Sequence, residues 1–274
     1  MFFVDEDQVN LSGFVLSGGV AVLLVVAMSG AWALQRATRN AGWVDVVWSF
    51  STGAGGIACA LVPWPGEHLL SPRQMLVAVM AGAWSLRLGL HIADRTRHGP
   101  EDVRYAGFRR DWGADFERRM FWFLMIQAAA AWLLTLSMQV AARNPAPGLR
   151  LADVAGVAVL AGSVLGEAVA DAQLRRFRAG GTKGGICDIG LWGWSRHPNY
   201  FFEFLGWCAY PLLAISVGWP AGWLALTGPI FMFWLLRYVS GVPPLEATML
   251  ASRGDRFRAY QARVSAFVPL PPRR

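Results

Sequence analysis

Residues 190–203 combine charged and hydrogen-bonding side chains with the start of a hydrophobic run. Their sequence is Gly-Leu-Trp-Gly-Trp-Ser-Arg-His-Pro-Asn-Tyr-Phe-Phe-Glu. Ionisable groups are rare in apolar segments, because placing one in a bilayer costs roughly 2.5 to 3.5 kcal/mol unless it is paired or hydrated. We therefore interpret this stretch as the best candidate for a functional site.

Asn199 and Glu203 are four residues apart, so a helix that begins near Pro198 would place both side chains on one face. Arg196 and His197 come directly before that helix start. A free helix N-terminus, together with cationic or donor side chains, favours an anion. The pattern therefore predicts a site for a ligand phosphate.

A second group of ionisable residues closes the preceding apolar run. Glu167, Asp171 and Arg178 keep one helical face, so they could line the same cavity. For the two acidic residues we favour a ligand role, because they lie deeper in the run. Arg175 and Arg176 fit equally well a helix end whose long side chains reach toward the surface.

Asp45 lies inside another apolar run, residues 43–48, with no basic residue nearby in the sequence. A buried, unpaired carboxylate favours its protonated form, so Asp45 could donate a proton. The alternative is a structural ion pair with Arg87 or Arg95 on a neighbouring helix. His91 has a similar pair of interpretations, a reactive group or a hydrogen-bonded packing residue.

Helices must position these side chains, because the composition is that of an integral membrane protein. Of 274 residues, 55% are hydrophobic and only 16% are charged. About 20 apolar residues cross the hydrocarbon core as a helix. Such windows predict an all-α protein with seven transmembrane helices, at 12–34, 43–62, 74–93, 120–141, 151–170, 200–216 and 220–238. The last two could form one kinked helix, but together they exceed one span about twofold.

Basic residues fall mainly on one side of these predicted spans, as they do in cytoplasmic loops. Of the 25 basic residues, only Arg73, Arg143 and Arg150 fall on the other side. We therefore expect the N-terminus outside and the C-terminus in the cytoplasm. The acidic residues at 5–7 have the wrong charge for a signal peptide, so the first helix should be retained.

The formal net charge is +7, but the basic residues flank predicted membrane helices and do not form a folded basic domain. This argues against a nucleic-acid partner. Three cysteines predict neither a disulfide framework nor a zinc site. The glycine-rich residues 180–193 match no nucleotide fingerprint and predict a flexible linker. We expect one domain, 1–274, acting as a monomer. Its segment from about 239 to 274 should lie on the cytoplasmic surface, with an amphipathic helix at 252–262.

The motif Gly190-Leu191-Trp192, Ser195-Arg196-His197-Pro198-Asn199-Tyr200 and Glu203 resembles the signature of the bacterial membrane branch of the steroid 5-alpha-reductase superfamily. The resemblance extends through residues 40–48, 87–105, 240–246 and 260–269. It implies a multi-pass reductase of the bacterial inner membrane that transfers hydride from NADPH to a conjugated C=C bond of a lipid or steroid-like enone. The substrate would enter from the bilayer, and the cofactor would bind from the cytoplasm.

The resemblance carries cofactor roles to Asp171, Arg178, Asn199, Glu203 and Tyr260, and less directly to Arg95 and Arg253. The predicted NADPH site also includes Glu167, Ser195, Arg196, His197 and Tyr200. Arg178, Arg196 and Arg253 are expected to bind its phosphates, because guanidinium groups suit them.

In the steroid enzymes that the chain resembles, a Gln-Glu pair and a Tyr act at the substrate carbonyl, where a donor stabilises the charge built by hydride transfer. Here Asp45 stands at about the place of the Gln-Glu pair, and Ile92 aligns with the Tyr. The predicted catalytic group is therefore Asp45, with His91 or Tyr105 as a second donor.

Other classes stay open. The Arg-His-Pro-x-Tyr segment is also similar to that of isoprenylcysteine carboxyl methyltransferases, which use S-adenosylmethionine. The arginines favour NADPH, since a sulfonium cofactor needs a carboxylate rather than several cations. A non-catalytic lipid-binding homologue is the third class, because Ile92 replaces the Tyr. A transporter is disfavoured, since the ionisable groups gather at one face.

Overall fold

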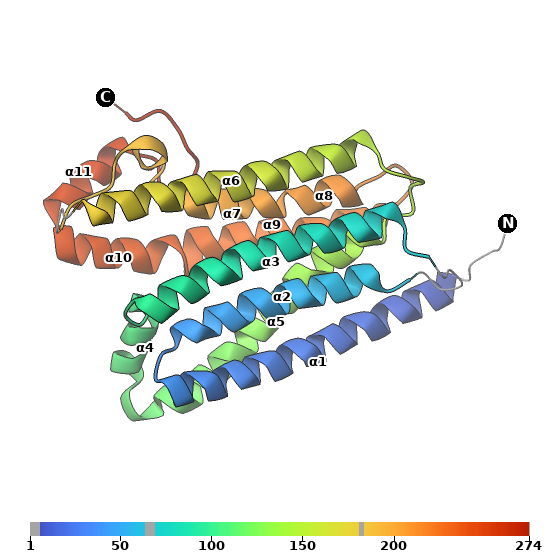
Figure 1. Ribbon diagram of the computed structural model, residues 1–274, viewed down its shortest axis with the longest axis horizontal. Coiled ribbons are helices and arrows are strands. Elements are labelled where there is room, and N and C mark those ends of the chain that lie inside the picture. The colour runs from blue at the N-terminus through green and yellow to red at the C-terminus, as the bar shows by residue number, and fades with distance from the viewer. Residues whose placement is uncertain (1–5, 64–68, 181–183, 274) are drawn as a thin grey trace. The chain divides into compact units, whose positions relative to one another are not determined.

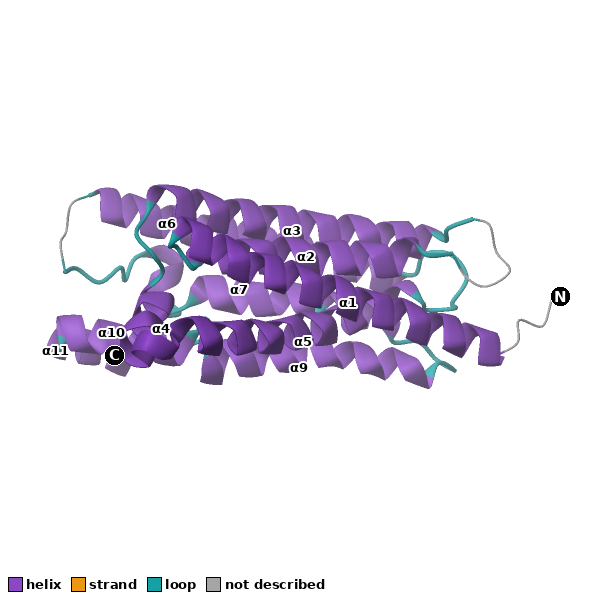
Figure 2. Ribbon diagram, turned by 90° about the horizontal axis from the view of Figure 1, so that it is seen from below, coloured by secondary structure: helices purple, strands orange, loops and turns teal. Residues whose placement is uncertain are grey.

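The computed structural model describes residues 6–63, 69–180 and 184–273. These residues form helices throughout, with no strand among them beyond two isolated bridges, Ser195–Ser265 and Ser216–Trp219 (Figure 2). By their contacts they divide into two compact units. Unit 1 comprises residues 1–153 and 210–228, and unit 2 comprises residues 154–209 and 229–274.

Four long helices build most of unit 1. They are α1 (Glu6–Thr38), α2 (Gly42–Leu61), α3 (Pro72–His98) and α5 (Phe116–Ala142). The shorter α4 (Val103–Trp112) and η1 (Gly113–Asp115) connect α3 to α5, and η3 (Pro220–Leu226) packs on α5. Helix α2 contacts α1, α3 and α5, so it is the central helix of this unit (Figure 1).

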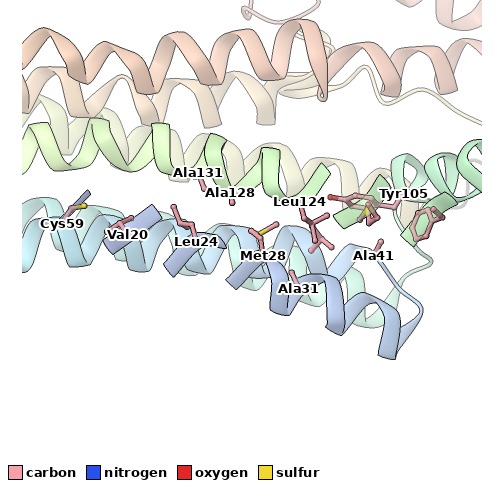
Figure 3. Close-up of a cluster of buried hydrophobic side chains, with 13 residues drawn as sticks. Val20, Leu24, Met28, Ala31, Ala41, Cys59, Tyr105, Leu124, Ala128 and Ala131 are labelled. Carbon is pink, nitrogen blue, oxygen red and sulfur yellow. The ribbon is translucent and has the colours of Figure 1, made fainter. Parts of the chain in front are cut away.

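Apolar side chains from α1 and α5 form the core of unit 1, with Leu24, Met28 and Leu124 fully buried (Figure 3). Small residues allow α2 to approach its neighbours closely. A Cβ atom added at Gly53 would lie only 2.2 Å from the Cβ of Ser85 on α3. Close approach through small residues is a usual way for helices to pack where lipid removes the hydrophobic drive for association.

Arg73, in the first turn of α3, is the centre of a buried polar cluster. Its side chain is 2% exposed and donates to Asp153 from Nε (3.1 Å) and Nη2 (2.9 Å). The remaining N–H groups donate to the backbone carbonyls of Asn144, Ala146 and Gly148. All five guanidinium N–H groups thus have acceptors. Arg150 also contacts Asp153 at 3.4 Å, so one carboxylate pairs with two of the three arginines expected on the outer side.

Unit 2 contains the remaining helices apart from α8 (Ala209–Ala214), of which all but the first residue belongs to unit 1. They are α6 (Leu151–Ala179), η2 (Gly190–Gly193), α7 (Pro198–Trp207), α9 (Thr227–Trp234), the π-turn η4 (Leu235–Val239), α10 (Val242–Arg253) and α11 (Asp255–Arg263); the first residues of α6 and α9 belong to unit 1. Helix α7 packs on α6, where the Ser163 hydroxyl donates to the Phe202 carbonyl and Gly206 leaves room for Ser163. The predicted start of α7 at Pro198 is confirmed.

Six helical segments of the described chain are long and apolar enough to cross a membrane. They are Gly13–Thr38, Gly42–Leu61, Pro72–His98, Val103–Ala142, Leu151–Ala179 and Pro220–Arg253. The window 200–216 instead contains two short helices, α7 and α8 (Ala209–Ala214), which break at Cys208. The acidic Asp5 and the linker residues 181–183 lie outside the described residues.

The amphipathic helix expected at 252–262 is present as α11 (Asp255–Arg263), but it begins three residues later than expected. Helix α10 ends at Arg253 and α11 begins at Asp255, because Gly254 between them has φ +52°. This left-handed conformation ends a helix and favours glycine. Phe257 and Tyr260 of α11 are buried, so the helix does have an apolar face.

Replacing Arg73 by Met should destabilise unit 1 by about 3–5 kcal/mol, because Asp153 would stay buried without its bidentate partner. Thermal unfolding of the purified protein in detergent measures this effect. Arg118→Met is the matched control, since Arg118 forms an exposed pair with Asp115 that should contribute at most about 1 kcal/mol. Equal shifts for the two variants would contradict the structural role of Arg73.

Candidate functional sites

In unit 1, α2 and α4 bring Asp45 together with Arg104 and Tyr105. The Tyr105 hydroxyl donates to Oδ1 of Asp45 at 2.6 Å, and Nη2 of Arg104 donates to Oδ2 at 2.6 Å. The expectation of an unpaired carboxylate was therefore wrong. Its partner is Arg104, which is 59 residues away in the sequence, rather than Arg87 or Arg95.

Asp102 fixes the direction of α4 and so places both partners of Asp45. Its carboxylate caps the helix by accepting from the backbone N–H of Arg104 at 3.0 Å, and it also accepts from the Arg104 and Arg95 side chains. Burial alone would raise the pKa of Asp102, but the hydrogen bonds and charge of Arg104, with a contribution from Arg95, outweigh burial and lower it. Asp102 is thus an ionised anchor at the start of α4.

Glu101, beside this cap, ties the start of α2 to α4. It accepts from the backbone N–H of Ala41 at 2.9 Å and from Nη2 of Arg109 at 3.0 Å. Gly42 opens α2, and a Cβ there would clash with Thr96 at 2.8 Å. These contacts hold the first turn of α2, which carries Asp45, against α3 and α4.

The Tyr105 side chain is 1% exposed and also lies near Gln127 of α5, whose Nε2 is 3.5 Å from the hydroxyl. The Oε1 atom of Gln127 is buried and has no hydrogen-bond partner among the described residues. Asp45 accepts hydrogen bonds from both Arg104 and Tyr105, so the hydroxyl of Tyr105 is the O–H donor of this cluster. His91 is half-buried on α3, and its catalytic role stays a prediction.

In unit 2, Glu246 of α10 organises the segment that precedes α7. It accepts from Nε and Nη2 of Arg196 (2.7 and 3.2 Å), from Nε2 of His197 (3.0 Å) and from Nε2 of Gln261 (2.7 Å). Nη1 of Arg196 donates to the carbonyls of Gln261 and Val264. Arg196 is therefore engaged within the protein, in contrast to its expected role as a phosphate ligand.

The C-terminal segment, residues 261–273, runs alongside this motif, and three further hydrogen bonds join the two. The backbone N–H of Arg196 donates to the Ser265 carbonyl (2.8 Å), and that of Leu270 donates to the Trp194 carbonyl (3.0 Å). The Ser195 hydroxyl donates to the Phe267 carbonyl (2.8 Å). Ser195 thus fastens the C-terminal segment.

His197 is 3% exposed, and its ring stacks on Tyr200 at 5.5 Å between centroids. Burial lowers the pKa of His197 even though Glu246 opposes this, so the neutral imidazole is favoured. A neutral ring that faces a carboxylate carries its proton on Nε2. Nδ1 is then an acceptor, and it has no partner among the described residues. It is suited to a hydroxyl or amide donor on a ligand rather than to a phosphate.

The other predicted cofactor residues divide by location. Glu203, Asp171 and Glu167 are buried in unit 2, and Asn199 and Tyr200 are half-buried in the first turn of α7. Glu203 accepts from Nε1 of Trp207 at 3.0 Å. These residues keep their predicted roles as expectations.

Among the remaining predicted residues, Tyr260 donates to the Trp192 carbonyl, and burial raises the pKa of its hydroxyl. Nε of Arg253 donates to the Gly185 carbonyl at 3.1 Å, and Arg178 is exposed. Arg95 belongs to unit 1, where it binds Asp102.

Sequence reasoning missed Arg104, Asp102, Gln127, Glu246 and Gln261. Asp102 could have been found, because an Asp directly before a helix is a common N-cap. Gln127 was visible as a lone amide in an apolar run. Glu246 and Arg104 carry no local signal, because their partners lie 50 and 59 residues away.

The fold and these clusters define an all-helical protein with several membrane-length helices and a buried polar network in each unit. The chain belongs to a family of proteins of unknown function, DUF1295, which matches residues 31–264. No curated protein and no solved structure gives a significant match.

Replacing Glu246 by Ala should destabilise unit 2 by about 3–5 kcal/mol, because Arg196 would keep a buried charge without its carboxylate. Thermal unfolding and limited proteolysis of the C-terminal segment should both report this loss. Asp255→Ala is the control, since Asp255 pairs with Arg258 on the exposed surface. A Glu246→Ala variant as stable and as protease-resistant as Asp255→Ala would refute the organising role.

Proposed function

We propose that the protein is an NADPH-dependent reductase of the bacterial inner membrane that adds hydride to the conjugated C=C bond of a hydrophobic enone. The observation that carries this proposal is the buried Tyr105 hydroxyl, held at 2.6 Å from Asp45 and beside the Arg104 cation. Such a hydroxyl is suited to donate to an oxygen on which negative charge develops. The resemblance of the motif at 190–203 to the steroid 5-alpha-reductase superfamily supports the reaction class.

In this proposal unit 2 holds the cofactor. The first turn of α7 offers backbone N–H groups that are not used within the helix, and these favour a phosphate oxygen. Nδ1 of His197 accepts from a ribose hydroxyl or a carboxamide N–H, and Asn199 and Glu203 lie on the same helix. NADPH, when bound, supplies the hydride.

In this proposal Tyr105 supplies the proton chemistry. As the β-carbon of the enone accepts hydride and its two electrons, charge moves to the carbonyl oxygen, and the Tyr105 hydroxyl turns from Asp45 to donate its hydrogen bond to that oxygen. The α-carbon then takes a proton from Tyr105 or from water, which gives the saturated carbonyl compound and NADP⁺. Asp45 positions the Tyr105 hydroxyl, and Arg104 holds the Asp45 carboxylate in place.

The proposed topology has seven spans, with α7 and α8 together forming the sixth. Residues 198–214 would measure about 25 Å as continuous helix, which is close to the hydrocarbon thickness. The N-terminus would be outside and the C-terminus cytoplasmic, since the basic residues of α4, α10 and α11 then face the cytoplasm.

A methyltransferase that uses S-adenosylmethionine is the second candidate, and one observation favours it. Arg196 and Arg253, two of the three arginines expected on phosphates, donate to groups within the protein. A sulfonium cofactor needs no such cations, and Nδ1 of His197 could accept from its ribose or its amino group.

Binding of the cofactor can be tested by thermal stabilisation of the detergent-purified protein with NADPH, NADH or S-adenosylmethionine. A ligand that binds only the folded state raises stability by RT ln(1 + [L]/Kd). We expect a shift with NADPH that Asn199→Ala reduces and that Thr248→Ala, on the exposed face of α10, retains. A shift with S-adenosylmethionine alone would establish the second candidate instead.

The donor assignment predicts that Tyr105→Phe retains the NADPH shift but lowers enone reduction by roughly 10²–10⁴-fold, the usual contribution of general acid catalysis. This change leaves the Asp45–Arg104 pair in place. Asp45→Asn should also abolish turnover, because it misplaces the hydroxyl. Tyr238→Phe, at an exposed tyrosine, is the matched control. Turnover of Tyr105→Phe at the control level would eliminate Tyr105 as the donor.

A further inference from the structure

Unit 2 contains an open pocket of about 420 Å³ between η4 and the C-terminal segment 261–273. Phe233, Phe267, Val268 and Leu270 supply an apolar wall. Of the residues predicted to hold a cofactor, only Arg196 lines it. The pocket is therefore separate from the chemistry assigned above.

The pocket is strongly cationic. Arg196, Arg237, Arg263 and Arg273 line it, and no carboxylate does. Glu246 neutralises Arg196, and Asp188 lies 3.4 Å from Arg263. Arg237 and Arg273 have no carboxylate partner within the described part of the chain. Two uncompensated cations in one pocket favour an anion.

The surroundings of the pocket are those of a membrane interface. Phe233 and Arg237 are four residues apart, at the end of an apolar stretch in the candidate span Pro220–Arg253. Trp234, Tyr238 and Leu270 are each at least half-exposed beside them. Exposed aromatic side chains next to arginine are typical of the level of lipid head groups.

We propose that this pocket binds the phosphate group of an anionic membrane lipid. Arg237 and Arg273 contact the phosphate, and an acyl chain lies against Phe233 and Leu270. A soluble phosphate compound would use the cations but gain nothing from the apolar wall, whereas a lipid uses both. Clusters of basic residues beside a membrane helix recognise anionic lipids in the same way. The proposal does not depend on the reductase activity.

The experiment measures stabilisation of the full-length, detergent-purified protein by added lipid. Phosphatidylglycerol should raise the unfolding temperature in a saturable manner. Phosphatidylcholine, whose head group has no net charge, and glycerol phosphate, which has no acyl chain, should give little shift. NADPH is titrated separately, so failure of the cofactor site and failure of the lipid site are distinguished.

The variant Arg237→Gln/Arg273→Gln should weaken the phosphatidylglycerol response roughly 30-fold, as expected for the loss of two cations at a membrane surface. Arg273→Gln alone, near the chain end, should weaken it roughly fivefold and guards against misfolding of the double variant. The matched control is Arg256→Gln/Arg258→Gln, which removes two exposed cations of α11 that do not line the pocket.

Three results would overturn the proposal. Equal stabilisation by phosphatidylcholine would show that charge is not recognised, and equal stabilisation by glycerol phosphate would show a soluble ligand instead. An equal loss in the Arg256/Arg258 control would show that general surface charge, rather than this pocket, attracts the lipid.

Discussion

A charge inside a protein of this composition must be neutralised by another part of the chain, because hydrocarbon offers it no water. The ion pairs Arg73–Asp153, Asp45–Arg104 and Arg196–Glu246 meet this requirement. Each pair joins segments that are 50 to 80 residues apart. Neutralisation therefore also fixes which segments meet, and the polar networks of both units are built around these pairs.

In unit 2 this dependence has a direct chemical consequence. Glu246 binds Arg196 and His197 together, and so decides the tautomer of the imidazole. Arg196 donates to the Glu246 carboxylate and to two backbone carbonyls. Its positive charge is therefore balanced within the protein and does not attract an anionic ligand. What the motif leaves unused is the start of α7 and the buried acceptor nitrogen of His197. The motif is thus a scaffold, and the C-terminal segment completes it.

The helices could be predicted from the sequence because length and apolar content are local properties. Six of the seven windows coincide with long apolar helices, and α7 begins at Pro198 as its position indicated. The break at Cys208 had no strong signal, whereas Gly254 was a recognisable helix terminator in hindsight. A single glycine in a polar segment therefore indicates a helix boundary more reliably than the amphipathic pattern around it.

Site residues were predictable by type but not by partner. Asp45 was singled out because a carboxylate in an apolar run needs an explanation, and Tyr105 was named as a possible companion; the two are in contact. The partner Arg104 was missed, because it precedes Tyr105 in a segment whose many basic residues look alike in sequence. Asp102 distinguishes Arg104 from the other basic residues, because its cap fixes the first turn of α4 and so sets which side chains of that turn face α2.

Pairing with Arg104 changes the chemistry expected of Asp45 as well as the position of its side chain. An Asp with no donor beside it would be the candidate proton donor itself, whereas Asp45 accepts from both Arg104 and Tyr105 and so orients the Tyr105 hydroxyl. The sequence alone is compatible with Asp45 as a proton donor and with Asp45 as an acceptor that orients a neighbour. The identity of its partners distinguishes these two roles. In the proposed reaction, acid catalysis therefore depends on the Tyr105 hydroxyl, which Asp45 and Arg104 keep oriented.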